Sequence, residues 1–508
     1  MNKLNHFFYW SLTIFISFNF SLRANNITSF CQLEDLQKTP TLQDGRVKPL
    51  ESYARDVEKF LFEKKSYHLK LDLHSSTEFY CLLSLAPQEK TLSWLKKDLW
   101  VNLHHEKTRD LLKNTHDGKN ALSYFQLQIQ ADQIRSALMR EREEGSYKKE
   151  LQNLLSKANL IQTILAKENW MVFHEGDFKN ISELDPLNQE DLIASTQIYQ
   201  DKNPDDFYLL ELTYIKLNLY SWALLLTLMA ILTLAFSRRE NYLGWSLSIL
   251  TLTLQITATT MRILISNRAP ITNMYETVMF SGMGCLLLVT FIAFFKKDRR
   301  FLLAGLVYNF STLLMIRFAN NMLSSSIKPL VPVLRDNFWL STHVTTVILS
   351  YSAFAMSWPL ANWVIIRLAQ GKLTKDQLAD YNGLLYTSLK WGTVLLSAGV
   401  ILGGVWADYS WGRFWGWDPK ETWSLIVLLC YMVILHGKST QWITKRAFPF
   451  LVAFAFLSVI FAWFGVNYIL ASGLHSYGFS EGGAIFILSI FMVQIIIGLW
   501  CYWQTKKR

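Results

Sequence analysis

The sequence has few cysteines and none of the short cysteine motifs that mark redox or haem-carrying proteins. Five of its 508 residues are cysteine, and no C-x-x-C occurs, which argues against thioredoxin-like chemistry. No C-x-x-C-H occurs either, so the chain is not itself a c-type cytochrome. Cys285, Cys430 and Cys501 lie in apolar runs and are interpreted as apolar filler. Cys31 and Cys81 lie in a polar N-terminal region, where oxidation to a disulfide stays open.

Long apolar runs dominate the second part of the chain. From Leu217 onward, runs of about 18 to 25 apolar residues, long enough to cross a bilayer, alternate with short basic loops. We predict nine membrane spans, at residues 217–236, 243–261, 277–295, 301–319, 341–366, 384–404, 421–437, 447–469 and 483–503. The predicted fold class is therefore all-α, with a polytopic membrane helix bundle formed by residues 216–508.

The loops carry their positive charge on one side of this bundle. Fifteen Lys or Arg and only four acidic residues fall in the segments 237–242, 296–300, 367–380, 438–446 and 504–508. The positive-inside rule places these segments in the cytoplasm and the other loops outside. We therefore expect a multi-pass protein of the bacterial inner membrane. Because the positive charge is scattered over loop ends, a nucleic-acid partner is not expected.

The N-terminal region precedes the spans and is predicted to be exported. Residues 1–24 are typical of either a cleaved signal peptide or an uncleaved anchor, and both alternatives place residues 25–215 in the periplasm. We predict a mainly helical exported domain, because residues 121–142 and 148–168 show apolar residues at helical spacing. Earlier in the domain, the dipeptide Asp44-Gly45 is a turn signal. No catalytic or metal-ligand spacing occurs here, so docking or scaffolding is the expected role.

Tryptophan is concentrated in one outward loop. The window 406–423, "WADYSWGRFWGWDPKETW", holds five of the nineteen tryptophans. Within it, Asp418, Pro419 and Glu421 predict a helix start, with Asp as the cap, Pro at the first helical position and Glu at the third. Two or three tryptophans would fit an interfacial belt. Five favour a flat aromatic surface, which suits a large planar ligand held by stacking.

Histidine is scarce in the nine-span region, where only His343, His436 and His475 occur. A planar aromatic ligand at a membrane surface raises the possibility of haem, which needs axial ligands. His343 opens the span 341–366 on the outer side, and His475 lies in the outward loop that follows the tryptophan window. These two side chains are candidate ligands from opposite faces. His436 ends the span 421–437 near the cytoplasmic side, and an intramembrane histidine indicates a functional site.

These residues resemble a known family. "WGRFWGWDPKETWSL" (411–425) resembles the WWD signature of the haem-handling superfamily that includes CcmC, CcmF and CcsA, in its CcsA form. "GLHSYG" (473–478) and "SNRAPITNMYET" (266–277) are similar to outward segments of the CcsA side of System II cytochrome c synthases. This resemblance covers roughly residues 217–508. "GRVKPLESYAR" (45–55) resembles a segment of fused CcsB–CcsA chains.

The resemblance implies a site for haem b on the outer side of the membrane. His343 and His475 would be the axial ligands of the iron, and His436 would belong to a route for haem from the cytoplasm. Arg268 and Arg413 are outward cations suited to haem propionates, although interface anchoring is an equal alternative. The implied WWD loop, residues 406–423, supplies Trp406, Trp411, Trp415, Trp417 and Asp418.

The resemblance also implies a reaction and its partners. The activity would be that of a haem lyase subunit, which presents ferrous haem to an apocytochrome c whose C-x-x-C-H thiols add to the vinyl groups. A CcsB-like membrane subunit would supply a second membrane histidine, for which His6 is a weak substitute, and thiol-reducing proteins would act in the same pathway. The alternative is a haem exporter or chaperone that serves a separate ligase. An ordinary transporter would need charged or broken helices at the midplane, and the predicted spans contain no ionisable pair.

Overall fold

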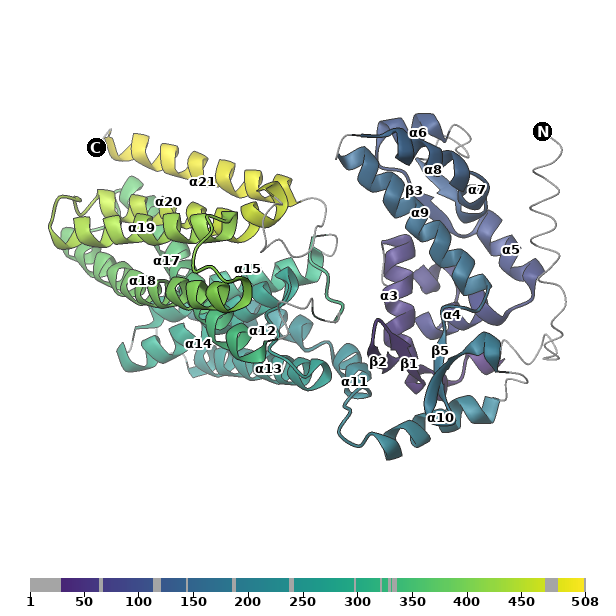
Figure 1. Ribbon diagram of the computed structural model, residues 1–508. Helices are drawn as coiled ribbons and strands as arrows, with labels where there is room; N and C mark the ends of the chain where they lie inside the picture. Colours follow the sequence, from purple (N-terminus) through teal and green to yellow (C-terminus); the bar gives the residue numbers. More distant parts are fainter. Residues whose placement is uncertain are drawn as a thin grey trace. The chain divides into compact units, whose positions relative to one another are not determined.

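The computed structural model divides into two compact units, and the division falls between Thr213 and Tyr214, close to the predicted boundary. It describes residues 29–63, 67–112, 120–142, 145–184, 189–236, 242–296, 298–319, 322–327, 330, 336–470 and 483–506. The predicted signal or anchor at 1–24, with His6, lies outside the described residues, and so does His475. Figure 1 shows the helices and strands of both units.

Unit 1 is mainly helical, as predicted, and also contains two small antiparallel sheets that were not predicted. Its α-helices are α3 (Leu50–Phe62), α4 (Ser76–Leu85), α5 (Gln88–Lys97), α6 (Glu106–Leu111), α7 (Tyr124–Ile129), α8 (Ala131–Arg140), α9 (Ser146–Leu165), α10 (Gln189–Lys202) and α11 (Leu210–Leu217). One sheet has the order β2-β1-β5-β6, and β3 pairs with β4 in the other. The strands are β1 (Pro40–Gln43), β2 (Arg46–Pro49), β3 (Trp100–Asn102), β4 (Ala121–Ser123), β5 (Met171–His174) and β6 (Asp177–Asn180).

Local sequence signals explain several of these elements. Asp44 and Gly45 both have positive φ, 51° and 78°, the conformation that a two-residue hairpin turn between β1 and β2 requires. The predicted helix at 148–168 is α9. The predicted helix at 121–142 is wrong in its first part, because residues 121–123 pair with β3, and Ser123 then caps α7 through a capping box with Gln126.

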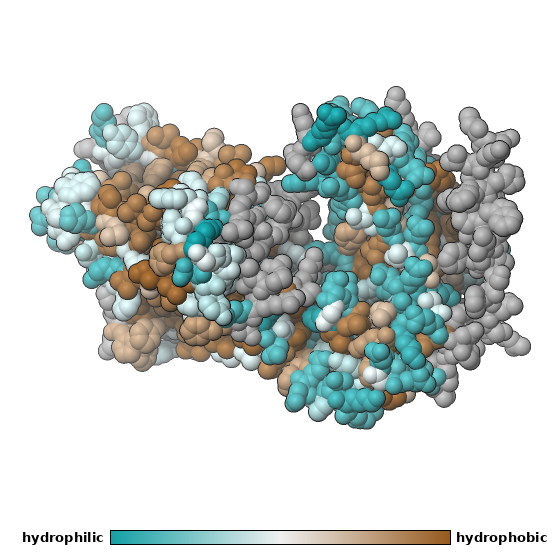
Figure 2. All heavy atoms as spheres, viewed as in Figure 1, coloured by the Kyte–Doolittle hydropathy of each residue, from teal (hydrophilic) through white to brown (hydrophobic). Residues whose placement is uncertain are grey.

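Unit 2 is the predicted bundle of membrane helices. Nine helices of the described part of the chain are long and apolar enough to cross a membrane, and Figure 2 shows apolar side chains over much of the visible face of this unit. The helical segments are α12 (Leu219–Phe236), which follows α11, α13 (Tyr242–Ser266), α14 (Met274–Lys296), α15 (Arg299–Phe318), η7 (Leu340–Val344) with α17 (Thr345–Ala369), α18 (Lys375–Trp411), α19 (Pro419–Ser439), α20 (Ala447–Ile460) with η8 (Phe461–Leu470), and α21 (Gly483–Lys506). A short helix, α16 (Asn337–Trp339), precedes η7.

A disulfide joins Cys31 to Cys81 in unit 1 and answers the question that the sequence left open. Cys31 precedes the 3-10 helix η2 (Glu34–Lys38), and Cys81 lies in α4. Both cysteines are buried in the hydrophobic core of this unit. The bridge therefore fastens the N-terminal segment of unit 1 to its helical core.

We expect removal of this bridge to destabilise unit 1 selectively. Replacing both cysteines with serine opens a loop of 50 residues, for which the chain-entropy relation gives about 4 kcal/mol. Limited proteolysis of the full chain during heating should then cleave unit 1 at a lower temperature. Cys430→Ser, in α19, is the control and should leave the cleavage of unit 1 unchanged. Equal protease resistance with and without the bridge would contradict a stabilising role.

Candidate functional site

The tryptophan window forms the end of one helix, a short loop and the start of the next. α18 continues to Trp411, and Gly412 ends it with a φ of 68°, the left-handed conformation favoured after a helix. The loop is therefore residues 412–418, shorter than the predicted 406–423, because nothing before Gly412 interrupts the helix. We call this end of unit 2 the tryptophan end, defined by Trp406, Trp411, Trp415 and Trp417.

The predicted helix start is confirmed. The carboxylate of Asp418 accepts a hydrogen bond from the main-chain N–H of Lys420 at 2.8 Å, and Pro419 is the first residue of α19. Glu421 Oε2 accepts from the N–H of Asp418 at 3.1 Å and from that of Gly416 at 2.7 Å. Both carboxylates therefore hold the loop in shape. Asp418 is buried, so its contacts are those of a structural cap.

The tryptophans do not form one flat surface. Trp415 and Trp417 meet edge to face, with 6.0 Å between ring centroids and an interplanar angle of 89°. Trp417 is 70% exposed, whereas Trp406 is 6% exposed inside the helix end. The guanidinium of Arg413 lies over the ring of Trp411, 5.8 Å from its centroid. The window thus separates into exposed rings on the loop and a buried ring below them.

His343 lies in the π-helical turn η7 and packs against α18. Its Nδ1 is 2.9 Å from the carbonyl oxygen of Gly399. Because a carbonyl oxygen only accepts hydrogen bonds, Nδ1 is the donor in this contact. A π-helical turn inside an α-helical segment is frequent at functional sites. This contact fixes the orientation of the ring, and in a neutral imidazole the second nitrogen, Nε2, would be the one able to bind a metal.

Two glycines of α18 let this segment approach closely, Gly399 at Val347 and Gly403 at the imidazole of His343. Gly399 and Gly403 follow the G-x-x-x-G spacing that lets membrane helices approach closely. A Cβ on Gly403 would lie 2.6 Å from Cε1 of His343, which is closer than real Cβ contacts allow. Only glycine therefore permits the His343 ring to lie against this helix.

Trp406 lies beside His343 and carries an unsatisfied donor. The two ring centroids are 5.7 Å apart. The indole Nε1 of Trp406 is buried and has no hydrogen-bond partner among the described residues. Such a buried N–H costs about 1–3 kcal/mol when it stays unpaired. The structure therefore brings together a histidine nitrogen and a hydrogen-bond donor that lacks its acceptor.

Of the other two predicted histidines, only His436 has a described position, and it lies away from the tryptophan end. His436 lies in the last turn of α19, and the helical rise of about 1.5 Å per residue puts it about 25 Å from Pro419. It is exposed on the helix surface. His475 belongs to the segment 471–482, outside the described residues, which connects η8 to α21. His343 alone of the three therefore has a described position at the tryptophan end.

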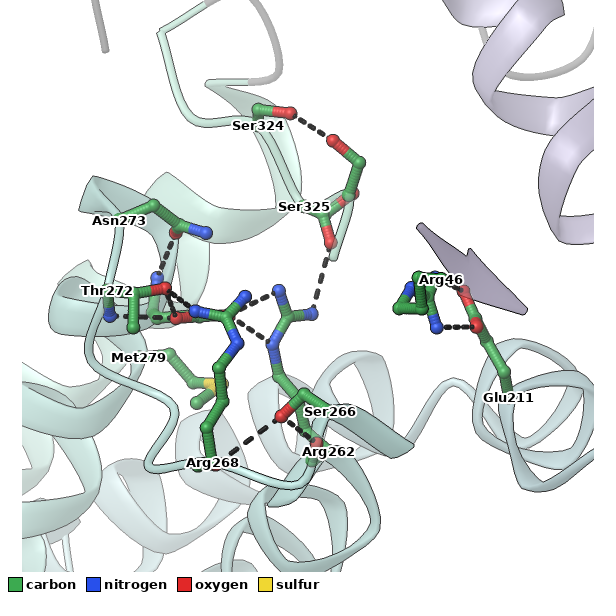
Figure 3. A network of polar contacts seen from close by, with 12 residues as sticks. Arg46, Glu211, Arg262, Ser266, Arg268, Thr272, Asn273, Met279, Ser324 and Ser325 are labelled. Atoms are coloured by element: carbon green, nitrogen blue, oxygen red, sulfur yellow. Dashed lines mark hydrogen bonds and ion pairs between the residues drawn. The ribbon is translucent and has the colours of Figure 1, made fainter. Parts of the chain in front are cut away.

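A buried ion pair at the same end was missed by the sequence analysis. Arg262, on α13, donates from Nε and Nη2 to Glu276 Oε1, on α14, at 2.9 and 2.8 Å (Figure 3). Both side chains are at most 1% exposed. One predicted span ended at residue 261 and the next began at residue 277, so both charges were assigned to the loop between them. The pair lies at the helix ends, so it does not bear on the expectation that the midplane of the spans holds no ionisable pair.

The two predicted cations differ in how accessible they are. Arg268 donates to the hydroxyl of Thr272, its Nη2 is 4.0 Å from Glu276, and its side chain is 7% exposed. Arg413 pairs with Glu421 at 3.4 Å, and its side chain is 33% exposed. Of the two, Arg413 is therefore the cation that a molecule at the surface reaches more easily.

Comparison with known proteins finds relatives for unit 2. The model of the cytochrome c assembly protein family matches residues 216–475. The cytochrome c biogenesis protein CcsA of Guillardia theta is 32% identical over 277 residues, which cover 49% of this chain and 90% of the relative. CcsA of Synechococcus sp. strain CC9311 is also 32% identical, over 52% of this chain and 98% of the relative. Protein NrfI of Wolinella succinogenes is 36% identical, over 47% of this chain and 26% of its own length.

The chain thus has a membrane helix bundle, a tryptophan-rich helix end and relatives that match this bundle. It belongs to the cytochrome c assembly protein family. Within this family it is of the CcsA type, and it acts in cytochrome c biogenesis.

We expect Gly403→Ala to reduce cytochrome c maturation, because the added Cβ forces the His343 ring away from Gly399. Overpacking of this kind costs about 1–3 kcal/mol. The readout is the amount of mature c-type cytochrome in cells that contain the variant as their only protein of this type. Gly383→Ala, on the same helix and with open space around its Cβ, is the matched control and should mature cytochrome normally. Normal maturation in Gly403→Ala would contradict the need for this close approach.

Proposed function

We propose that the protein binds haem b at the tryptophan end, on the outer face of the bacterial inner membrane, and presents it for attachment to apocytochrome c. The observation that carries this proposal is the hydrogen bond from His343 Nδ1 to Gly399 O. Metal-binding histidines usually donate their second ring N–H to a carbonyl or carboxylate, which fixes the tautomer and the ring orientation. The iron would be bound by Nε2.

The unpaired N–H of Trp406 supports the same ligand. Haem carries two propionate carboxylates, and a carboxylate oxygen is a strong acceptor for a buried indole N–H. The exposed ring of Trp417 and the half-buried rings of Trp415 and Trp411 would contact the porphyrin edge, and Arg413 would pair with a propionate. Asp418 would act on the ligand only by keeping the loop in shape, and Arg268 by holding its own loop.

The remaining histidines have proposed roles in coordination and transfer. His475 would be the second axial ligand, since it follows η8 and precedes α21 in the chain. His436 would belong to a route that brings haem from the cytoplasmic side. A CcsB-like membrane subunit would add the second membrane histidine, and unit 1 would serve as the exported docking domain.

The proposed chemistry depends on position and on the state of the iron. Each thiol of a C-x-x-C-H segment adds across one vinyl group, so that its S–H and one C=C are replaced by a C–S and a C–H bond. This addition changes no net oxidation state, but the pathway requires ferrous iron and reduced thiols, for which thiol-reducing partners would be responsible. The histidine of the segment would then replace a protein ligand and allow release. The protein contributes binding, orientation and exclusion of water.

The purified protein should contain haem with two histidine ligands. His343→Ala and His475→Ala should each change the absorbance bands of the reduced form and lower the bound haem several-fold, because each removes one axial ligand. His174→Ala, in unit 1, is a control and should keep the wild-type spectrum. A haem-free wild-type preparation, or unchanged spectra in both variants, would contradict the proposal.

Co-expression with a C-x-x-C-H substrate separates the two candidate activities. A haem lyase subunit should yield thioether-linked product when a CcsB-like partner is present. An exporter or chaperone would load haem on this chain without such product, and that result would favour the delivery role. Product from this chain alone would contradict the need for a partner.

A further inference from the structure

Arg262 and Glu276 form a buried ion pair in which each carboxylate oxygen of Glu276 accepts two hydrogen bonds. Oε1 receives the two N–H groups of Arg262, and Oε2 receives the main-chain N–H of Thr272 at 2.8 Å and its hydroxyl at 2.7 Å. Asn273 caps the same helix start, since its Oδ1 accepts from the N–H of Glu276 at 2.9 Å. Glu276 therefore links α13, through Arg262, to the loop that contains Thr272.

The second guanidinium arm of Arg262 reaches a third segment. Nη1 donates to the carbonyl oxygen of Ser325 at 3.0 Å, and Figure 3 shows the side chains of Arg262 and Arg268 extending toward Thr272 and Ser325. Ser325 belongs to the segment after α15. Arg262 and Glu276 thus connect the end of α13, the loop 267–273, the start of α14 and the segment at Ser325.

The loop 267–273 is in contact with the candidate site. Ile271, in this loop, forms one buried cluster with Leu340 and Trp406, and Ala269, Trp339 and Val344 pack around it. Leu340 is the first residue of η7, the turn that carries His343. The cluster around Ile271 therefore packs against both the indole of Trp406 and the turn that carries His343.

The π-helical turn η7 needs such support from the residues packed around it. A π-helical hydrogen-bond pattern is rare and is usually maintained by its surroundings. An ion pair in a low-dielectric environment is strongly directional, because both partners would be left unpaired if either moved. A charged pair therefore holds the loop in one arrangement where apolar contacts alone would tolerate several.

We propose that the Arg262–Glu276 ion pair is a positioning element for the His343–Trp406 site, acting through the loop 267–273 and Ile271. This inference deepens the proposed function, on which its haem readout rests. Neither charged residue contacts the haem-binding atoms. Their role is to keep the imidazole of His343 on Gly399 and the indole of Trp406 beside it.

The test compares Glu276→Gln with a matched buried polar variant on the neighbouring helix. Gln255→Met, in α13, removes a buried interhelical hydrogen bond to Asn309 of 3.0 Å that does not belong to the ion pair. Hydrogen–deuterium exchange on the full chain needs no haem. We expect Glu276→Gln to accelerate exchange several-fold in residues 337–347 and 267–273, and Gln255→Met to leave these peptides at the wild-type rate.

The haem spectrum is the second readout. Glu276→Gln should shift the absorbance bands of the reduced protein in the direction of His343→Ala, and Arg262→Lys, which keeps the charge but cannot make all three guanidinium contacts, should shift them in the same direction by less. Unchanged exchange at residues 337–347 in a folded Glu276→Gln protein would overturn the proposal, and so would equal effects of Gln255→Met. A wild-type protein without haem would instead contradict the proposed function, because the exchange readout would still report on the ion pair.

Discussion

The hydrogen bond from Nδ1 of His343 to the carbonyl oxygen of Gly399 decides what the tryptophan end can do. It makes Nδ1 the donor and fixes the orientation of the imidazole against α18. The bond forms because glycine at position 403 lets the ring lie against the helix, because glycine at 399 lets Val347 approach, and because the π-helical turn η7 carries the side chain there. With any other tautomer or any larger residue at 403, Nε2 would not be available to a metal.

The membrane environment explains why the carboxylates at this end accept so many hydrogen bonds. Unpaired polar groups are costly where water is absent, and the carboxylates at this end accept hydrogen bonds in caps, loops and ion pairs. Glu276 accepts four hydrogen bonds, and Glu421 closes the tryptophan loop. The N–H of Trp406 is an exception among the described residues, and it lies beside His343. A molecule bound beside this indole would supply the acceptor that its N–H lacks.

Local patterns predicted the parts of the structure that depend on neighbouring residues. The spans, the turn at Asp44 and Gly45 and the start of α19 follow from hydropathy, turn chemistry and capping, and all three are present. The length of α18 and the pair of Arg262 with Glu276 were missed, because hydropathy windows end a helix where charge or tryptophan begins. Strands β3 and β4 pair across twenty residues of chain, and the π-helical turn depends on packing against α18, so neither has a local signal.

The most direct test is an electron cryo-microscopy map of the haem-loaded full chain. The account predicts haem at the tryptophan end, with its iron on Nε2 of His343, Nδ1 still on the carbonyl of Gly399, and a haem oxygen within hydrogen-bond distance of Trp406 Nε1. Haem bound to His436 alone, or His343 turned away from α18 with its Nε2 far from iron, would contradict it.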